Sequence, residues 1–114
     1  MAAAANKTAE QVLKHHEQAL LARDLRGIVE DYTGDSVFLT ANGAFRGTES
    51  IKQAYRAVLA TLTPEVLGNM KVIKQEVSGE YVLLIWSAPP QVSFGTDSFH
   101  IRDGKIMMQS VATR

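Results

Sequence analysis

The chain has 114 residues, of which 46% are hydrophobic and 21% are charged. This length suits one domain with its own core, and the composition is that of an ordinary globular protein. Twelve basic residues balance twelve acidic ones, which excludes the electrostatic footprint of a nucleic-acid-binding or membrane-surface protein. The chain has no cysteine and no apolar N-terminal run long enough for a signal or a membrane span. We therefore expect a cytoplasmic protein with neither nucleic acid nor membrane as a partner.

Helical periodicity dominates the first half of the sequence, and three helices are predicted there, over 8–23, 25–32 and 48–62. Thr8 and Gln11 have the spacing of a capping box, so the first helix should begin at this point. Asp24 is a suitable N-cap for the second helix, whose apolar face would include Tyr32. Pro64 is expected to end the third helix.

Strand-like patterns dominate the second half. Four long strands are predicted there, over 70–77, 81–88, 92–101 and 105–113. Two short strands are predicted earlier, over 36–40 and 44–46, after a turn over 33–35. The connections between the last four strands are so short that these strands must form antiparallel hairpins. Helices followed by a meander indicate the α+β class, with the helices covering one face of a curved antiparallel sheet. Residues 1–7 are expected to be a flexible lead-in to a single domain over 8–114.

Asp97 lies in an apolar, strand-like run, where period-two alternation puts it on one face with Gly95, Phe99 and Ile101. Among apolar neighbours its pKa would rise, so it could act as an acid or as a hydrogen-bond donor. The alternative is a half-exposed strand residue paired with an arginine or a lysine.

His16 lies on the apolar stripe of the first predicted helix, whereas His15 falls about 100° away and should be nearer solvent. An imidazole can be a base, an acid or a donor near neutral pH. The alternative is an ordinary buried histidine whose hydrogen bonds are satisfied. The three histidines are scattered and form no metal-ligand spacing, so we expect neither a metal nor another cofactor.

Four stretches of the sequence are typical of one family: ARDLRGIV at 22–29, DSV at 35–37, FRG at 45–47 and DSFHIRDGKI at 97–106. They resemble the nuclear transport factor 2-like superfamily, in particular its ketosteroid isomerase and SnoaL-like polyketide cyclase branches. The resemblance covers the chain from about residue 8 onward. It implies a cone-shaped, cystatin-like α+β roll in which a curved antiparallel sheet wraps around three N-terminal helices. It also implies a pocket at the open end and a homodimer formed through the outer sheet face.

The ketosteroid isomerases use a carboxylate base, a tyrosine and a neutral aspartic acid. The resemblance puts the aspartic acid at Asp97, the tyrosine at His16 and the base at Thr40, which cannot act as a base at neutral pH. His16 and Asp97 are therefore the catalytic candidates, and ordinary ketosteroid isomerase chemistry is not expected.

The predicted pocket wall consists of Phe38, Thr40, Tyr55, Trp86, Phe99, Met107 and Val111. Such residues belong to a core more often than to a ligand site, but as a set they imply a small apolar ligand. The leading hypothesis is a SnoaL-like small-molecule pocket protein, with acid–base chemistry of the isomerase or cyclase kind on a carbonyl-bearing ligand. The alternative is a non-catalytic ligand-binding or dimerisation module, which the threonine at position 40 favours.

Overall fold

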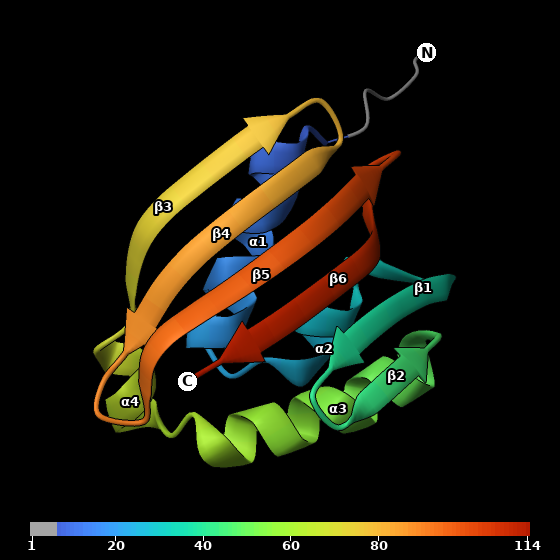
Figure 1. The fold of residues 1–114 in the computed structure, drawn as a ribbon. Coiled ribbons are helices and arrows are strands. Elements are labelled where there is room, and N and C mark those ends of the chain that lie inside the picture. Colours follow the sequence, from blue (N-terminus) through green and yellow to red (C-terminus); the bar gives the residue numbers. More distant parts are fainter. Residues whose placement is uncertain (1–6) are drawn as a thin grey trace.

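A computed structural model describes residues 7–114, and within them six strands form one curved, unclosed sheet with the helices on one of its faces (Figure 1). The helices are α1 (Ala9–Leu21), α2 (Leu25–Val29), α3 (Thr48–Thr61) and α4 (Pro64–Gly68). The strands are β1 (Tyr32–Thr40), β2 (Gly43–Arg46), β3 (Lys71–Ser78), β4 (Tyr81–Ala88), β5 (Val92–Arg102) and β6 (Lys105–Thr113). The predicted α+β class is confirmed, whereas most of the predicted lead-in lies outside the described residues.

The first two helices begin where the sequence predicts. At the start of α1 the Thr8 hydroxyl accepts from the Gln11 amide at 3.2 Å, and the Gln11 side chain accepts from the Thr8 amide at 2.9 Å. This reciprocal pair satisfies two amide groups that have no partner within the helix. Asp24 caps α2 by accepting from the amide of Gly27 at 3.1 Å. Both helix starts are therefore confirmed.

Two predicted boundaries are wrong. The second helix ends at Val29, and Tyr32 is the first residue of β1 because it pairs with Ile106 of the last strand. The predicted turn over 33–35 is an irregularity inside β1, where the register shifts between Tyr32 and Val37. Pro64 does end α3, but it also begins α4, because proline fits the first turn of a helix, where its missing N–H is not needed.

The strand order is β2-β1-β6-β5-β4-β3. The predicted antiparallel meander of the last four strands is confirmed, and β1 with β2 forms the predicted short hairpin. The sequence patterns did not predict that β1 pairs with β6 in parallel, which brings the first strand beside the last. The first helix crosses the concave face of this sheet (Figure 1). Its residues Val12 and Leu13 are buried in the core.

None of the helices among residues 7–114 is both long enough and apolar enough to cross a membrane.

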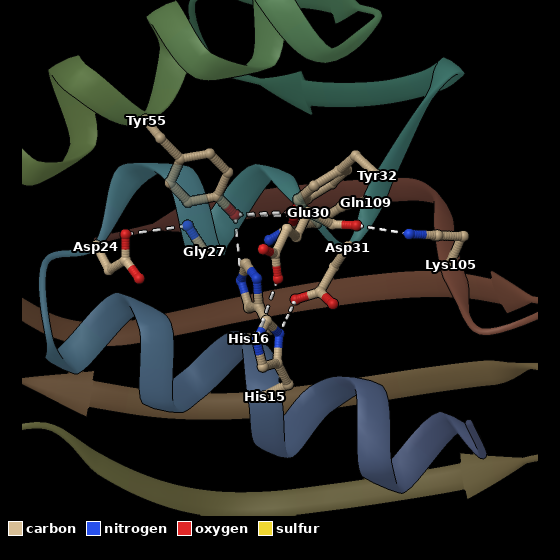
Figure 2. Close-up of polar contacts among 10 residues, drawn as sticks. All are labelled: His15, His16, Asp24, Gly27, Glu30, Asp31, Tyr32, Tyr55, Lys105 and Gln109. Carbon is tan, nitrogen blue, oxygen red and sulfur yellow. Dashed lines mark hydrogen bonds and ion pairs between the residues drawn. The ribbon is translucent and has the colours of Figure 1, made fainter. Parts of the chain in front are cut away.

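A buried carboxylate joins α1 to the segment between α2 and β1. Asp31 is nearly fully buried, and its Oδ2 lies 2.8 Å from Nδ1 of His15, whose side chain is 33% exposed (Figure 2). Burial raises the pKa of Asp31, and the hydrogen bond to His15 opposes this rise. The backbone carbonyl of Asp31 also accepts from the amide of Ile106 at 2.7 Å, so the segment is tied to the last strand as well.

We predict that His15→Ala lowers the free energy of unfolding by about 1–3 kcal/mol at neutral pH, because Asp31 is left buried without its partner. A carboxyl whose native pKa is raised favours the native state more as it gains its proton. The loss should therefore shrink as the pH falls through the raised pKa of Asp31. Urea unfolding at several pH values measures both effects.

His100→Ala is the matched control, because His100 pairs with the partly exposed Glu80 at 2.9 Å. Such a surface pair contributes little to stability because solvent screens it. An equal loss in the two variants would contradict the role given to Asp31.

Candidate functional site

A pocket with a volume of about 380 Å³ lies between the helices and the concave face of the sheet. Residues of α1, α3, β1, β4, β5 and β6 contribute to its wall. Most lining side chains are apolar, and the aromatic rings of Phe38 and Tyr55 stack with centroids 5.1 Å apart and an interplanar angle of 12°. The wall is therefore suited to a flat apolar molecule.

The structure brings nearly all of the predicted site residues to this one pocket. Its lining includes His16, Phe38, Thr40, Tyr55, Trp86, Asp97, Phe99 and Val111. Met107 does not line it. His100 pairs with Met108 and Ile101 pairs with Ile106, so Met107 is the extra residue of a bulge in β6. The bulge breaks the alternation on which the placement of Met107 in the wall depended.

Asp97 is the buried carboxyl of the pocket, with 7% of the residue exposed. Side chains along β5 alternate between buried and more exposed positions as predicted, because Gly95, Phe99 and Ile101 are buried on the same face as Asp97. The indole Nε1 of Trp86 donates to Asp97 Oδ1 at 2.6 Å, and Nε2 of Gln109 donates to Oδ2 at 2.6 Å. Burial raises the pKa of Asp97 to about 6, and these two hydrogen bonds limit the rise.

A chain of hydrogen bonds leads from Asp97 across the core. Because Gln109 directs its NH₂ group at Asp97, its Oε1 accepts from the hydroxyl groups of Tyr32 and Tyr55, at 2.9 Å from the latter. The two tyrosine oxygens lie 3.0 Å apart. Burial raises the pKa of both tyrosines, so both stay protonated at neutral pH. Figure 2 shows the tyrosines converging on the amide of Gln109.

His16 is at the far end of this chain, with its Nε2 3.2 Å from the Tyr55 hydroxyl (Figure 2). Its ring meets Tyr32, Tyr55 and Phe99 edge-on. Burial lowers the pKa of His16 to about 4, so the imidazole is neutral at pH 7. No salt bridge joins His16 to Asp97 within residues 7–114, and Tyr55 and Gln109 connect them instead.

Thr40 lies in the pocket lining, but its hydroxyl serves the tight turn between β1 and β2. The hydroxyl oxygen accepts from the Asn42 amide at 3.0 Å. It also lies 3.4 Å from the Gly43 carbonyl oxygen, to which it donates. A threonine in this position holds the turn and supplies no base.

Among the polar lining residues that the sequence analysis did not predict, Gln109 and Glu17 bear most on the chemistry of the pocket. Gln109 shares the strand alternation of Val111, so its position could have been inferred from spacing, but its bond to Asp97 could not. Glu17 follows His16 on α1 and lines the pocket, with Oε2 buried and without a hydrogen-bond partner among the described residues. Charged residues on a helix usually face solvent, so no sequence signal marks Glu17 as a pocket residue. Across residues 7–114 no three His, Asp or Glu side chains gather as a metal site.

No protein-family model matches the chain, and no curated protein matches it in sequence. Solved structures do match. A SnoaL-like protein of unknown function from Burkholderia thailandensis is 16% identical, over 93% of this chain and 94% of that one, with a TM-score of 0.77. A candidate polyketide cyclase from Sinorhizobium meliloti is 18% identical, over 89% and 93% of the two chains, with a TM-score of 0.73. TerC, co-crystallized with polyporic acid, is 18% identical, over 93% and 91%, with a TM-score of 0.72.

These likenesses confirm the resemblance at the level of the fold. Nuclear transport factor 2-like (NTF2-like) proteins of unknown function from Cytophaga hutchinsonii and Burkholderia xenovorans also match, with TM-scores of 0.71 and 0.72, so the chain has the nuclear transport factor 2-like fold. Its curved sheet and its helices enclose the pocket described above. One fold supports many functions, so the activity has to be argued from the pocket itself.

Trp86 is the only tryptophan of the chain, so its fluorescence reports on Asp97. We predict that the emission of Trp86 titrates with a midpoint near the pKa of Asp97, about 6. This titration should vanish in Asp97→Asn and persist in Asp103→Asn, which changes an exposed carboxyl.

The same carboxyl should make stability depend on pH. Its pKa is raised from 3.8 to about 6 in the native state, which therefore binds the proton more tightly than the unfolded chain. Relative to Asp97→Asn, the parent should lose stability as the pH rises from about 4 to about 6. A pH-independent difference between the two proteins would contradict this assignment.

Proposed function

We propose that this protein is a small-molecule pocket protein of the SnoaL-like type, which binds an apolar ligand bearing a carbonyl group. The observation that carries the proposal is a single deeply buried carboxyl, Asp97, inside a largely apolar pocket. A carboxyl in such surroundings is characteristic of a site that handles protons or orients a polar group of a ligand. TerC, which shares the fold, was co-crystallized with polyporic acid, and this supports a ligand-binding use of the fold.

Acid–base chemistry is the catalytic form of this proposal. With a pKa of about 6, Asp97 is mostly ionised at pH 7 but gains a proton readily. Each of its oxygens accepts one hydrogen bond and keeps a free lone pair for a substrate proton. Asp97 would take a proton from the carbon next to the carbonyl group, leaving the electron pair on an enolate, and would return the proton at another carbon.

His16 has a positioning role in this proposal. Because it is neutral and reaches Asp97 only through Tyr55 and Gln109, it holds the tyrosine hydroxyl that anchors the amide. It is not an ion-pair partner of Asp97.

The second candidate function is a non-catalytic binding module. Thr40, which the sequence resemblance puts at the position of the isomerase base, is engaged by the β1–β2 turn. Both functions require ligand binding, and only the first requires proton transfer.

We predict that Asp97→Asn changes the affinity for cyclic ketones and polyketide-like phenols by about tenfold, because a buried charged hydrogen-bonding group contributes roughly 1–3 kcal/mol. His16→Gln should have a smaller effect, because it acts through Tyr55. A thermal-shift screen finds the ligands, since binding to the native state raises the melting temperature. Calorimetry then measures affinities, and deuterium exchange next to the ligand carbonyl measures proton transfer.

Exchange that Asp97→Asn abolishes would support the enzyme, and binding without exchange would support the module. Failure of every screened ligand to bind the parent would contradict both functions.

We also propose a homodimer formed through the outer face of the sheet. Strand pairing puts Leu83 and Leu39 on this face, in one row across the sheet with Ser98 and Ser110. Phe94 lies on the same face of β5, and all three apolar side chains are 37–42% exposed. Thr96 and Met108 extend the face, which is less polar than a fully hydrated surface.

We predict a dimer mass by light scattering at micromolar concentration, and a monomer for Phe94→Glu. Leu21→Glu is the matched control, because Leu21 is an apolar side chain on α1 that is 54% exposed and lies away from this face. A parent that is monomeric at every concentration would contradict the dimer.

A further inference from the structure

Two buried side-chain atoms lack a hydrogen-bond partner within residues 7–114, namely His16 Nδ1 and Glu17 Oε2. Both residues line the same pocket. Buried polar atoms are nearly always paired, and each unpaired atom costs free energy. Glu17 lines the cavity and is only partly buried, so a donor group of a bound molecule can reach its carboxylate.

Glu17 is the more informative of the two. Its side chain is partly buried, and this burial raises the pKa of its carboxyl. No lysine or arginine of the described chain forms a salt bridge with it. Arg23, just beyond the end of α1, donates to the carbonyl oxygens of Leu62 and Leu59 at 2.6 and 2.7 Å. Glu17 is therefore an acceptor without a cation beside it.

The charges of the whole pocket have one sign. Glu17 and Asp97 are the charged side chains among the described lining residues, and none of these residues is a lysine or an arginine. His16 adds no positive charge because it is neutral. An anion entering this pocket would meet two carboxylates in apolar surroundings, which is unfavourable. A neutral donor or a cation would be favoured, and the aromatic wall is compatible with a cation.

We infer that Glu17 forms a specificity site that accepts an O–H or N–H donor of the ligand and rejects carboxylates and phosphates. The inference rests on the proposed function, because it concerns the ligand of the same pocket. Glu17 belongs to α1 and Asp97 to β5, so the two carboxyls lie on the helix side and the sheet side of the cavity. A ligand whose donor binds Glu17 would present the C–H group next to its carbonyl to Asp97, because an ionised carboxylate accepts and does not donate.

The test uses an acetylnaphthalene core, which is flat and bears a carbonyl group. Its far ring carries an aminomethyl, hydroxyl, methoxy or carboxylate group, or no further group. Affinities are measured by calorimetry at about pH 8, where carboxyl groups are ionised. The proteins are the parent, Glu17→Gln and Glu10→Gln; Glu10 is an exposed carboxylate on the first turn of the same helix.

We expect the parent to bind the aminomethyl compound about tenfold more tightly than the methoxy compound, because a hydrogen bond to a charged group contributes about this factor. The hydroxyl compound should be intermediate and the carboxylate weakest. Glu17→Gln should reduce the preference for the aminomethyl compound to about threefold or less and improve binding of the carboxylate. Glu10→Gln should bind the series as the parent does.

The outcomes separate this inference from the proposed function. If unsubstituted acetylnaphthalene binds but the parent shows no preference for donors over the carboxylate, the specificity site is wrong and the proposed function stands. The same holds if Glu17→Gln keeps the full preference of the parent. If no member of the series binds the parent, the proposed function is contradicted and this inference is contradicted with it.

Discussion

Asp97 is only 7% exposed among apolar side chains at the pocket wall, and an ionised carboxyl in such surroundings requires hydrogen-bond donors. Trp86 and Gln109 supply them from the two strands on either side of β5. Once the amide of Gln109 donates to Asp97, its oxygen must accept, and it does so from two tyrosines. A single acidic residue on the sheet thus orders a polar chain that ends at His16 on the first helix.

Side chains pack closely next to this series of hydrogen bonds. Gly95 lies opposite Trp86 on the paired strands, and a Cβ added there would be 2.6 Å from the indole Cε2 atom. The absence of a side chain leaves room for the indole to reach Asp97. The parallel pairing of β1 with β6 then brings Phe38 to the same cavity, where it stacks on Tyr55. The wall and the polar chain therefore depend on contacts between residues far apart in the chain.

The same contacts decide the electrostatic character of the pocket. A protonated Asp97 would donate to a ligand, but here both of its oxygens already accept hydrogen bonds, and its pKa of about 6 leaves it ionised at pH 7. With Glu17 on the opposite side and a neutral His16, the cavity is rich in acceptors. A pocket of this kind differs in chemistry from the neutral oxyanion pair that the sequence resemblance to the ketosteroid isomerases implies.

The sequence by itself determined the features that arise from local spacing: the capped start of α1, the hairpin meander, and the inward face of β5 that includes Asp97. It also marked His16 through its place on an apolar stripe. Tertiary structure alone decided that Tyr32 begins a strand, because its partner, Ile106, is remote in sequence. It excluded Met107 from the pocket, since a bulge in pairing leaves no mark on the alternation of one strand. It also left Glu17 partly buried, because burial of a helix-flank residue depends on the elements packed against it.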